Sequence, residues 1–479
     1  MTTKNRQQNR LHGGYLMVLV LVFSSVLLTI ATSFISFIIL QSKVITQRVQ
    51  FEQAGQIAEA GLNYYKWYLA HYPDDTTNGT GGAGPYVDVY NDPEGTAIGE
   101  YSLTIASSTY CGEISSIDVI SEGHTYANPA VSRTVQAHYA QPSVAEYSYI
   151  LNSDVWAGED RVITGPYHSN GGIRMDGTNN SVVTSGQATW TCNSSFGCSP
   201  TATKDGVFTT TSNPNTSLFS FPSAPIDFAG ITVDLVLMRT RAQSDGIYIG
   251  PSDKSGYHLI FKANGKVEVR KVNSKEKEPK GYAWGYYMHI LNGTSFVGEY
   301  TPPSDCPLIY VEDQVWLEGV VNGKVTLAVA DHETSGDEEN SGAGPSIILN
   351  NNITYANSTS GLLAIGENEV LIGLVVPDDM ELNGIFIAQN GHFGRNYYGT
   401  DTKIPSSWES YAKRNSLTIN GTIVSNGRVG TKWVCSPDST YCSGFNNRIN
   451  NYDRNLVLSP PPMVPRTSDV YTFSDWRDK

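Results

Sequence analysis

The most regular pattern of apolar positions lies in the first 72 residues of the chain. Residues 15–40 (YLMVLVLVFSSVLLTIATSFISFIIL) contain no charged side chain. From residue 51 onward, small and apolar residues recur every three or four positions, which places them on one face of a helix. That face consists of Phe51, Gly55, Ala58, Leu62, Tyr65 and Leu69. The pattern predicts one helix over 15–72, apolar at 15–40 and amphipathic at 41–72, that ends before Pro73.

The apolar run is long enough to cross a membrane. Residues 15–40 would form a helix of about 39 Å, against a hydrocarbon layer of roughly 30 Å. Lys4, Arg6 and Arg10 precede the run, so we expect a single-pass protein with its N-terminus in the cytoplasm and its body outside the membrane. A cleaved signal sequence is the alternative. It would have an apolar region of roughly 7–15 residues and a small-residue cleavage site, and this run has neither.

The pattern changes from helical to strand-like after the predicted helix. Residues 74–96 are rich in turn-forming residues and predict a loop. Between 97 and 140, apolar and polar residues alternate with period two, as in GEYSLTIAS and SSIDVISEG. We therefore expect a head at 73–145, in which a small antiparallel sheet packs on the second half of the helix.

Residues 146–452 contain short segments that resemble one another. GPYHSNGGIRMDG (165–177), GIFIAQNGHFG (384–394) and GTIVSNGRVG (421–430) each combine alternating apolar residues with Asn-Gly. The repeats favour stacked β-coils, a β-solenoid, with Asn-Gly in left-handed turn positions. A β-sandwich with Asn-Gly hairpins is the competing interpretation.

Two further segments of this body have their own patterns. Strand-like stretches flank Asn264-Gly265, which predicts a hairpin within an antiparallel insertion at about 226–300. Residues 453–479 contain a Pro-Pro-Pro run and Trp476, and they predict an extended C-terminal tail. The fold class expected of the whole chain is α+β: a long N-terminal helix, a small sheet and a mainly β body.

The N-terminal region resembles a known family. HGGYLMVLVLVFSSVLL, followed by AEAGLNYYKWYL, is similar to the start of PilX-type minor pilins of type IV pili, and the likeness covers roughly residues 5–70. The resemblance implies a leader at 1–14 that prepilin peptidase removes after Gly14, leaving Tyr15 first. Major pilins carry glutamate at the fifth mature position, where this chain has Leu19, so the resemblance implies a minor component.

The small residues of the amphipathic part invite two interpretations. Small side chains let neighbouring helices approach closely, so Gly55, Ala58 and Gly61 would pack against other rods in a filament. The residues assigned to helix packing are Phe51, Gly55, Ala58, Glu59, Gly61 and Leu62. The alternative is that the same face packs on the head of its own chain.

Charge and cysteine content narrow the remaining options. The net charge is −14, from 32 Lys and Arg against 46 Asp and Glu, so nucleic acid is not an expected partner. The six cysteines suit an oxidising compartment. Short spacings predict the disulfides Cys192–Cys198 and Cys435–Cys442, and the remaining Cys111 and Cys306 could join the head to the body. The absence of C-x-x-C spacing disfavours a metal site.

The sequence contains no established catalytic motif, so we expect no enzymatic activity and no cofactor. His168 and His392 occupy similar places in two repeats and are the best candidates for acid–base chemistry. Residues 331–342 have the acidic character of a calcium loop but end in Gly342 rather than glutamate, which leaves only weak calcium binding open. Trp284, Tyr286, Tyr287 and Tyr300 form a candidate aromatic surface for adhesion.

The resemblance implies partners among other pilins and the pilus assembly machinery, with prepilin peptidase as the processing enzyme. The expected function is that of a minor pilin which assists assembly and presents a β-rich body for adhesion. Two alternatives stay open: a pseudopilin-like part of a type II secretion system, and a membrane-tethered β-solenoid enzyme that acts on carbohydrate.

Overall fold

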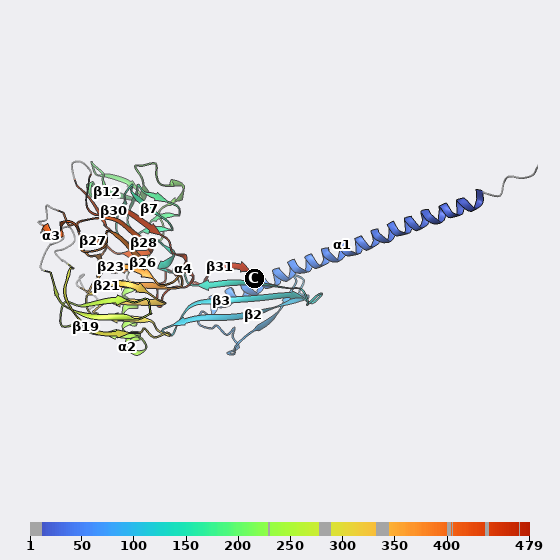
Figure 1. Cartoon of the computed structure of the whole chain (residues 1–479), viewed down its shortest axis with the longest axis horizontal. Coiled ribbons are helices and arrows are strands. Elements are labelled where there is room, and N and C mark those ends of the chain that lie inside the picture. Colours follow the sequence, from blue (N-terminus) through green and yellow to red (C-terminus); the bar gives the residue numbers. More distant parts are fainter. Residues whose placement is uncertain are drawn as a thin grey trace, which may run out of the picture. The chain divides into compact units, whose positions relative to one another are not determined.

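The computed structural model describes residues 12–228, 230–276, 289–331, 344–399, 404, 406–435, 440–468 and 470–479. The chain divides into two compact units. The first comprises residues 1–105, 119–137 and 476–479, and the second comprises 106–118 and 138–475. The predicted fold class is confirmed: a long apolar helix precedes a mostly β body that includes an antiparallel sheet (Figure 1).

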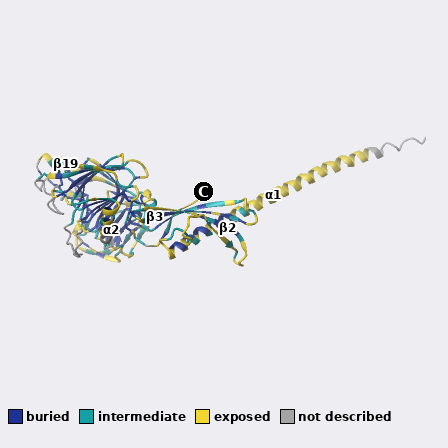
Figure 2. Ribbon diagram, turned by 90° about the horizontal axis from the view of Figure 1, so that it is seen from below, coloured by how far each residue is buried: buried dark blue, intermediate teal, exposed yellow. Residues whose placement is uncertain are grey.

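The N-terminal helix, α1, runs without interruption from His12 to His71. It contains no proline, so no backbone hydrogen bond of the helix is lost. Its four glycines lie at its start (Gly13 and Gly14) and on the face that packs on the sheet (Gly55 and Gly61). It ends two residues before Pro73, as the sequence predicts. Figure 2 shows that the first half of α1 is exposed and that buried residues begin only where the sheet covers the helix.

A five-stranded sheet follows α1, in the order β1-β2-β3-β4-β31. Strands β1 and β2 pair in antiparallel register, with Tyr86 opposite Leu103. The fifth strand is formed by the end of the chain, which the sequence analysis expected to be an extended tail. The strands are β1 Tyr86–Asn91, β2 Ala97–Tyr110, β3 Glu113–Thr125, β4 Ser132–Ala140 and β31 Thr472–Asp478.

The second unit is built from parallel ladders of strands. In one ladder each strand pairs in parallel with the next in the order β16-β20-β22-β24-β26-β28-β5-β8-β11-β15. A second ladder joins β17, β21, β23, β25 and β27, and a third joins β6, β9 and β14. Parallel pairing between successive turns of the chain is the arrangement expected of stacked coils, whereas a sandwich of hairpins would pair antiparallel.

The order of the main ladder does not follow the sequence. Strand β28 pairs with β5, so Ile423 lies beside Tyr149 although 274 positions separate them.

The strands of the second unit have the following bounds: β5 Tyr149–Leu151, β6 Val155–Ala157, β7 Arg161–Ile163, β8 Tyr167–Ser169, β9 Ile173–Met175, β10 Thr178–Asn179, β11 Val183–Ser185, β12 Thr189–Cys192, β13 Ala202–Asp205, β14 Val207–Phe208, β15 Phe219–Ser220, β16 Ile247–Ile249, β17 Tyr257–Phe261, β18 Val267–Lys275, β19 Leu291–Tyr300, β20 Leu308–Val311, β21 Val315–Val321 and β22 Lys324–Val329. The remaining ones are β23 Ile347–Tyr355, β24 Gly361–Gly366, β25 Val370–Ile372, β26 Asp379–Ala388, β27 Phe393–Arg395, β28 Lys413–Ser425, β29 Lys432–Cys435 and β30 Thr440–Asn451, with helices α2 Gly230–Ser244, α3 Ser406–Glu409 and α4 Arg454–Leu458.

The core of the second unit consists of aliphatic columns along these ladders. Ile309 lies beside Leu327, and Leu327 lies beside Ala364 in the next strand. All three side chains are buried in one cluster. Because each strand of the ladder contributes an apolar residue to the same column, their pairing buries a surface that a single strand would expose.

The three Asn-Gly pairs, at 170–171, 390–391 and 426–427, lie close together and are linked by hydrogen bonds through Asn152. Asn152 donates to Asn426 at 2.7 Å and accepts from Asn170 at 2.7 Å, and Asn426 donates to the Asn390 carbonyl at 3.3 Å. The predicted left-handed turn conformation is wrong, because Gly171, Gly391 and Gly427 do not have positive φ. Glycine is needed at Gly171 because another segment of backbone passes close to it: an added Cβ would lie 2.5 Å from the Asp154 nitrogen.

The insertion at 226–300 is only partly antiparallel. The Asn264-Gly265 hairpin is confirmed, with Gly265 at φ 84° between the antiparallel strands β17 and β18. Strand β18 also pairs antiparallel with β19. Strands β16 and β17, however, belong to the parallel ladders, and helix α2 was not predicted.

Candidate functional site: the N-terminal helix and its packing on the sheet

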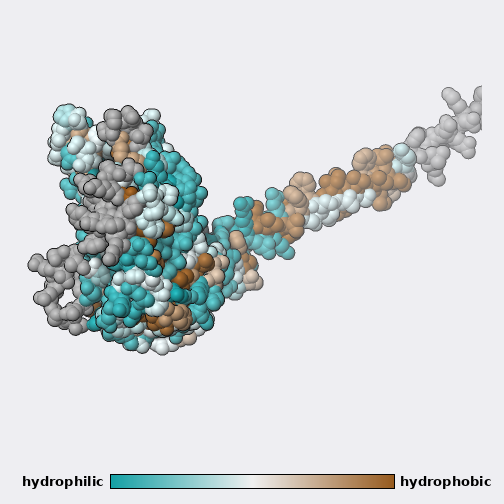
Figure 3. Space-filling model, turned by 60° about the vertical axis from the view of Figure 1, so that its left-hand side comes forward, coloured by the Kyte–Doolittle hydropathy of each residue, from teal (hydrophilic) through white to brown (hydrophobic). Residues whose placement is uncertain are grey.

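The first half of α1 exposes a continuous apolar surface. In the described part of the chain, one helix is long and apolar enough to cross a membrane, and its apolar part is not buried in the protein. Figure 3 shows these apolar residues along the helix, together with a paler strip. Five hydroxyl groups of this segment donate to carbonyls three or four residues earlier, for example Ser25 to Val22 at 2.8 Å and Ser33 to Thr29 at 2.7 Å. Their polarity is therefore satisfied inside the helix, as a hydrocarbon environment requires.

The second half of α1 packs its small residues on the sheet of the same unit. An added Cβ on Gly61 would lie 2.5 Å from the Ser121 hydroxyl and 2.8 Å from the Tyr101 ring. From the sheet side, a Cβ on Gly123 would lie 2.4 Å from the Ala58 nitrogen and 2.5 Å from the Ala54 carbonyl oxygen. Glycine on both partners lets the helix backbone approach the strand closely, and no other residue would fit without movement.

Arg133 of β4 anchors the rim of this contact. Its guanidinium lies 5.0 Å from the centre of the Phe51 ring and 3.4 Å from the Glu52 carboxylate. It also pairs with Asp478 of β31, which raises the pKa of Arg133 through that hydrogen bond. The chain end, the helix and β4 are thus joined through one side chain. A neighbouring bond from Asn128 to Gln50, at 2.9 Å, fixes the helix at the same level.

The C-terminal end of α1 is held by a carboxylate. Asp75 accepts hydrogen bonds from the Thr77 amide and hydroxyl at 2.7 and 2.6 Å, and from the Tyr68 hydroxyl at 2.5 Å. The bonds from Thr77 and Tyr68 lower the pKa of Asp75 to about 2. The same bond raises the pKa of Tyr68 to about 12. The turn after Pro73 is therefore tied back to the helix that precedes it.

The structure brings most of the predicted helix-packing residues together. Gly55, Ala58, Gly61 and Leu62 are buried on the sheet of their own unit, which is the alternative that the sequence left open. Glu59 is exposed. Phe51 is exposed apart from its contact with Arg133, although periodicity assigned it to the same face. Any contact between rods through this half of α1 would have to use the side that the sheet leaves uncovered.

The processing residues lie at the start of the helix. Gly14 and Tyr15 belong to α1, and the Tyr15 side chain is exposed. Sequence reasoning missed Gly123, Arg133, Asp75 and β31, all of which hold the helix. A glycine within an alternating strand, as at Gly123, is the one signal that marks a close backbone approach.

All three predicted disulfides are confirmed. Cys111–Cys306, Cys192–Cys198 and Cys435–Cys442 have sulfur atoms in bonding distance, and the described chain has no free cysteine. Cys111 was assigned to the head, yet residues 106–118 belong to the second unit together with Cys306. That disulfide therefore closes a loop within the second unit, across a separation of 195 residues.

The candidate catalytic groups have separate structural partners. His168 is buried and bonds Thr184 and Asn170, at 2.8 and 2.9 Å, and burial lowers its pKa. His392 lies 2.9 Å from the Glu369 carboxylate. Among the described residues no cluster of His, Cys, Asp and Glu is arranged to hold a metal ion. The candidate aromatic residues Trp284, Tyr286 and Tyr287, and all of the candidate calcium loop after Asp331, lie outside the described residues.

Comparison with known proteins gives limited information. No family model matches the chain, and no curated protein matches it. Among solved structures, the competence-associated pilin ComZ from Thermus thermophilus is similar at 12% sequence identity and a TM-score of 0.27, over 90% of this chain and 97% of that chain.

Proposed function

We propose that this chain is a pilin-like subunit of a type IV pilus or a related cell-surface filament. One observation carries the proposal: a single helix is fully exposed and apolar over its first half and packed on its own sheet over its second half. A segment of this kind needs lipid or other apolar helices around it, because apolar surface left in water is less favourable by a free energy of about 25 cal/mol for each Å².

Within that proposal the chain acts as a minor component. Leu19 stands where bulk pilins of the resembling family carry a glutamate, so the chain lacks the carboxylate that would match a neighbour's amino terminus in hydrocarbon. The second unit is then the part presented outside the membrane, and its disulfides suit that compartment. Assistance of assembly and surface adhesion are the roles proposed for the two parts.

Processing after Gly14 tests this proposal. The protein is recovered from native envelopes with and without active prepilin peptidase, and its N-terminus is sequenced. We expect Tyr15 first in the presence of the peptidase and Met1 in its absence, with the processed form present in sheared filaments. An N-terminus near residue 40, or a processed form that never accompanies filaments or their assembly proteins, would contradict it. Copurification with secretion proteins instead would favour the pseudopilin alternative.

A further inference from the structure

One arginine in the interior of the second unit has no carboxylate partner. Arg395 is the last residue of β27, and its side chain is fully buried. Its Nη2 atom donates to the backbone carbonyls of Leu374 at 3.0 Å and of Tyr411 at 2.7 Å. Its Nε and Nη1 atoms are also buried and have no hydrogen-bond partner among the described residues. The charge of this guanidinium and several of its N–H donors are therefore left unmatched.

The side chains around the Arg395 guanidinium include aromatic rings that cannot supply a negative charge. Its central carbon lies 5.2 Å from the centre of the Phe445 ring and 5.7 Å from the centre of the Tyr398 ring. Burial raises the pKa values of the Tyr398 and Tyr441 hydroxyls and lowers the pKa of Arg395 to about 10. At neutral pH the arginine is therefore charged, whereas both phenols are neutral.

A second guanidinium lies next to the first. Arg414 is 9% exposed, and its Nε atom donates to the same Tyr411 carbonyl at 3.3 Å. Two positively charged groups thus share one neutral acceptor. Asp378 lies 3.7 Å from Arg414, and in the described part of the chain no carboxylate pairs with Arg395. The two arginines therefore face one carboxylate, which leaves an excess of one positive charge inside the protein.

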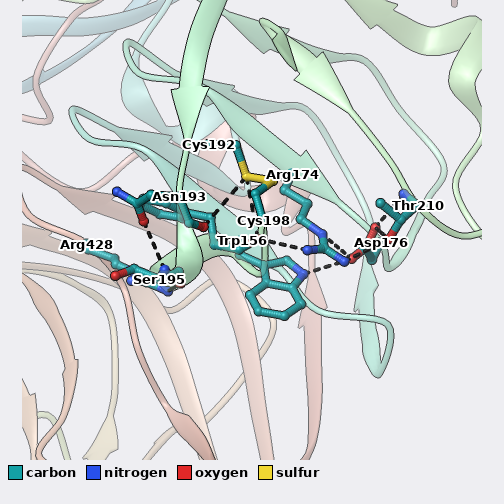
Figure 4. Close-up of a disulfide and its surroundings, with 10 residues drawn as sticks. Trp156, Arg174, Asp176, Cys192, Asn193, Ser195, Cys198, Thr210 and Arg428 are labelled. Carbon is teal, nitrogen blue, oxygen red and sulfur yellow. Dashed lines mark hydrogen bonds and ion pairs between the residues drawn. A yellow bond between two sulfur atoms is a disulfide. The ribbon is translucent and has the colours of Figure 1, made fainter. Parts of the chain in front are cut away.

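Other arginines of the second unit have what Arg395 lacks. Arg174 is nearly as deeply buried, but it pairs with the Asp176 carboxylate at 2.7 Å (Figure 4). Arg428 forms no ion pair with the residues that the structure describes, and it donates to the Ser195 carbonyl at 2.9 Å. Arg428 is only partly buried, however, so water can solvate its charge. Arg395 differs from both because it has neither a carboxylate nor contact with solvent.

A buried charge of this kind needs a counter-ion. Removing an ion from water has a large free-energy cost, and two carbonyl dipoles offset only part of it. Loss of the proton is not an alternative, because arginine stays protonated at neutral pH. Arg395 also joins segments that are distant in sequence: its amide donates to the Gly430 carbonyl at 2.9 Å, and its side chain reaches Leu374 and Tyr411. A group that neutralises Arg395 would therefore stabilise the contact between these segments.

We propose that the Arg395 guanidinium binds a chloride ion in the interior of the second unit. The Nε and Nη1 atoms supply the donors, and Arg414 adds a second positive charge nearby. A monovalent ion balances the excess of one positive charge, whereas a divalent ion such as sulfate would leave a new buried charge. Chloride then acts as a structural ion that stabilises the folded state by mass action. The inference does not depend on the filament role of α1.

Urea unfolding of the full chain in a non-ionic detergent tests the site. The unfolding equilibrium constant is measured in sodium chloride and in sodium gluconate at the same ionic strength, because gluconate is too large to replace chloride in an enclosed site. An ion that binds only the folded state lowers this constant by a factor of one plus the ratio of its concentration to its Kd. With a Kd of about 10 mM, about 100 mM chloride should lower the constant roughly tenfold relative to gluconate.

Variants separate binding from general effects of the two salts. Arg395→Met removes the buried charge and keeps an unbranched side chain, so the difference between chloride and gluconate should disappear. Arg428→Met is the matched control, because it removes an arginine that also lacks an ion pair in the described chain but is partly solvated. Its response to chloride should equal that of the unmodified protein. An equal response in the unmodified protein and in Arg395→Met would reject the site.

Crystals of the unmodified protein grown in sodium bromide decide the question even if Arg395→Met fails to fold. Bromide replaces chloride and has an anomalous scattering signal. We expect an anomalous peak within hydrogen-bonding distance of Arg395 Nε or Nη1. Absence of a peak at Arg395 would overturn the proposal.

Discussion

The contact between α1 and the sheet depends on the absence of a side chain at Gly123. An alanine there would place its Cβ 2.4 Å from the Ala58 nitrogen, 2.5 Å from the Ala54 carbonyl oxygen and 3.0 Å from the Ala58 Cα. All three atoms belong to the helix backbone, so no side chain can rotate away to relieve the overlap. Gly123→Ala must therefore push the helix and the strand apart by most of an ångström.

The cost of this displacement can be estimated from the packing it disturbs. Ile57, Leu62, Tyr65 and Leu69 are all essentially buried against the sheet and would lose part of their contacts. Overpacking of this kind costs about 1–3 kcal/mol. Since the unit opens locally, that loss corresponds to amide exchange roughly 5- to 150-fold faster in the helix segment and in β3.

Hydrogen–deuterium exchange followed by mass spectrometry measures the effect peptide by peptide, independently of the second unit. Gly82→Ala is the control, because a Cβ at Gly82 meets no atom within 4 Å. We expect faster exchange around residues 54–69 and 119–125 in Gly123→Ala only. Equal exchange in both variants would refute the close backbone packing on which this description of α1 depends.

Three further predictions concern other parts of the chain. Replacing Cys111 and Cys306 by serine should lower the free energy of unfolding of the second unit by about 5 kcal/mol, because the disulfide closes a loop of 195 residues. Urea unfolding measures this loss, and an unchanged midpoint would contradict the loop argument. Burial lowers the pKa of His289 to about 3, so below its unfolded value of about 6.5 the unfolded chain binds a proton that the folded chain does not. His289 therefore does not reduce the free energy of unfolding above about pH 6.5, and below that pH it reduces this free energy by up to about 1.4 kcal/mol per pH unit. Urea titrations at several pH values should show this slope, and His289→Gln should flatten it. Leu27→Lys places a charge in the exposed apolar segment, which costs about 3 kcal/mol in hydrocarbon. The fraction of the protein retained in carbonate-washed membranes should therefore fall, and an unchanged fraction would place that segment outside the bilayer.

The sequence predicted the elements whose signal is local. The uncharged run at 15–40 and the spacing of Ala58, Leu62 and Leu69 defined α1, because helix periodicity and proline placement act over a few residues. The two short disulfide loops and the Asn264-Gly265 hairpin also depend on near neighbours. The left-handed backbone conformation predicted for the Asn-Gly pairs was wrong, and the hydrogen bonds that join Asn152 to Asn170 and Asn426 were not predicted.

Features that join distant segments had no such signal. The pairing of β28 with β5 connects the late and early parts of the body, and β31 joins the first sheet from the end of the chain. Neither could be deduced from periodicity, because pairing between segments hundreds of residues apart is set by tertiary packing.

Photo-crosslinking from residue 27 tests the central claim most directly. The claim is that the apolar half of α1 stays attached to the molecule and is surrounded by lipid or by apolar helices of other subunits. A photoreactive amino acid in place of Leu27, activated in intact envelopes, should give products with lipid or with the apolar helix of another pilin-like chain. Absence of residue 27 from the mature protein, or products confined to this chain's own β body, would contradict the account.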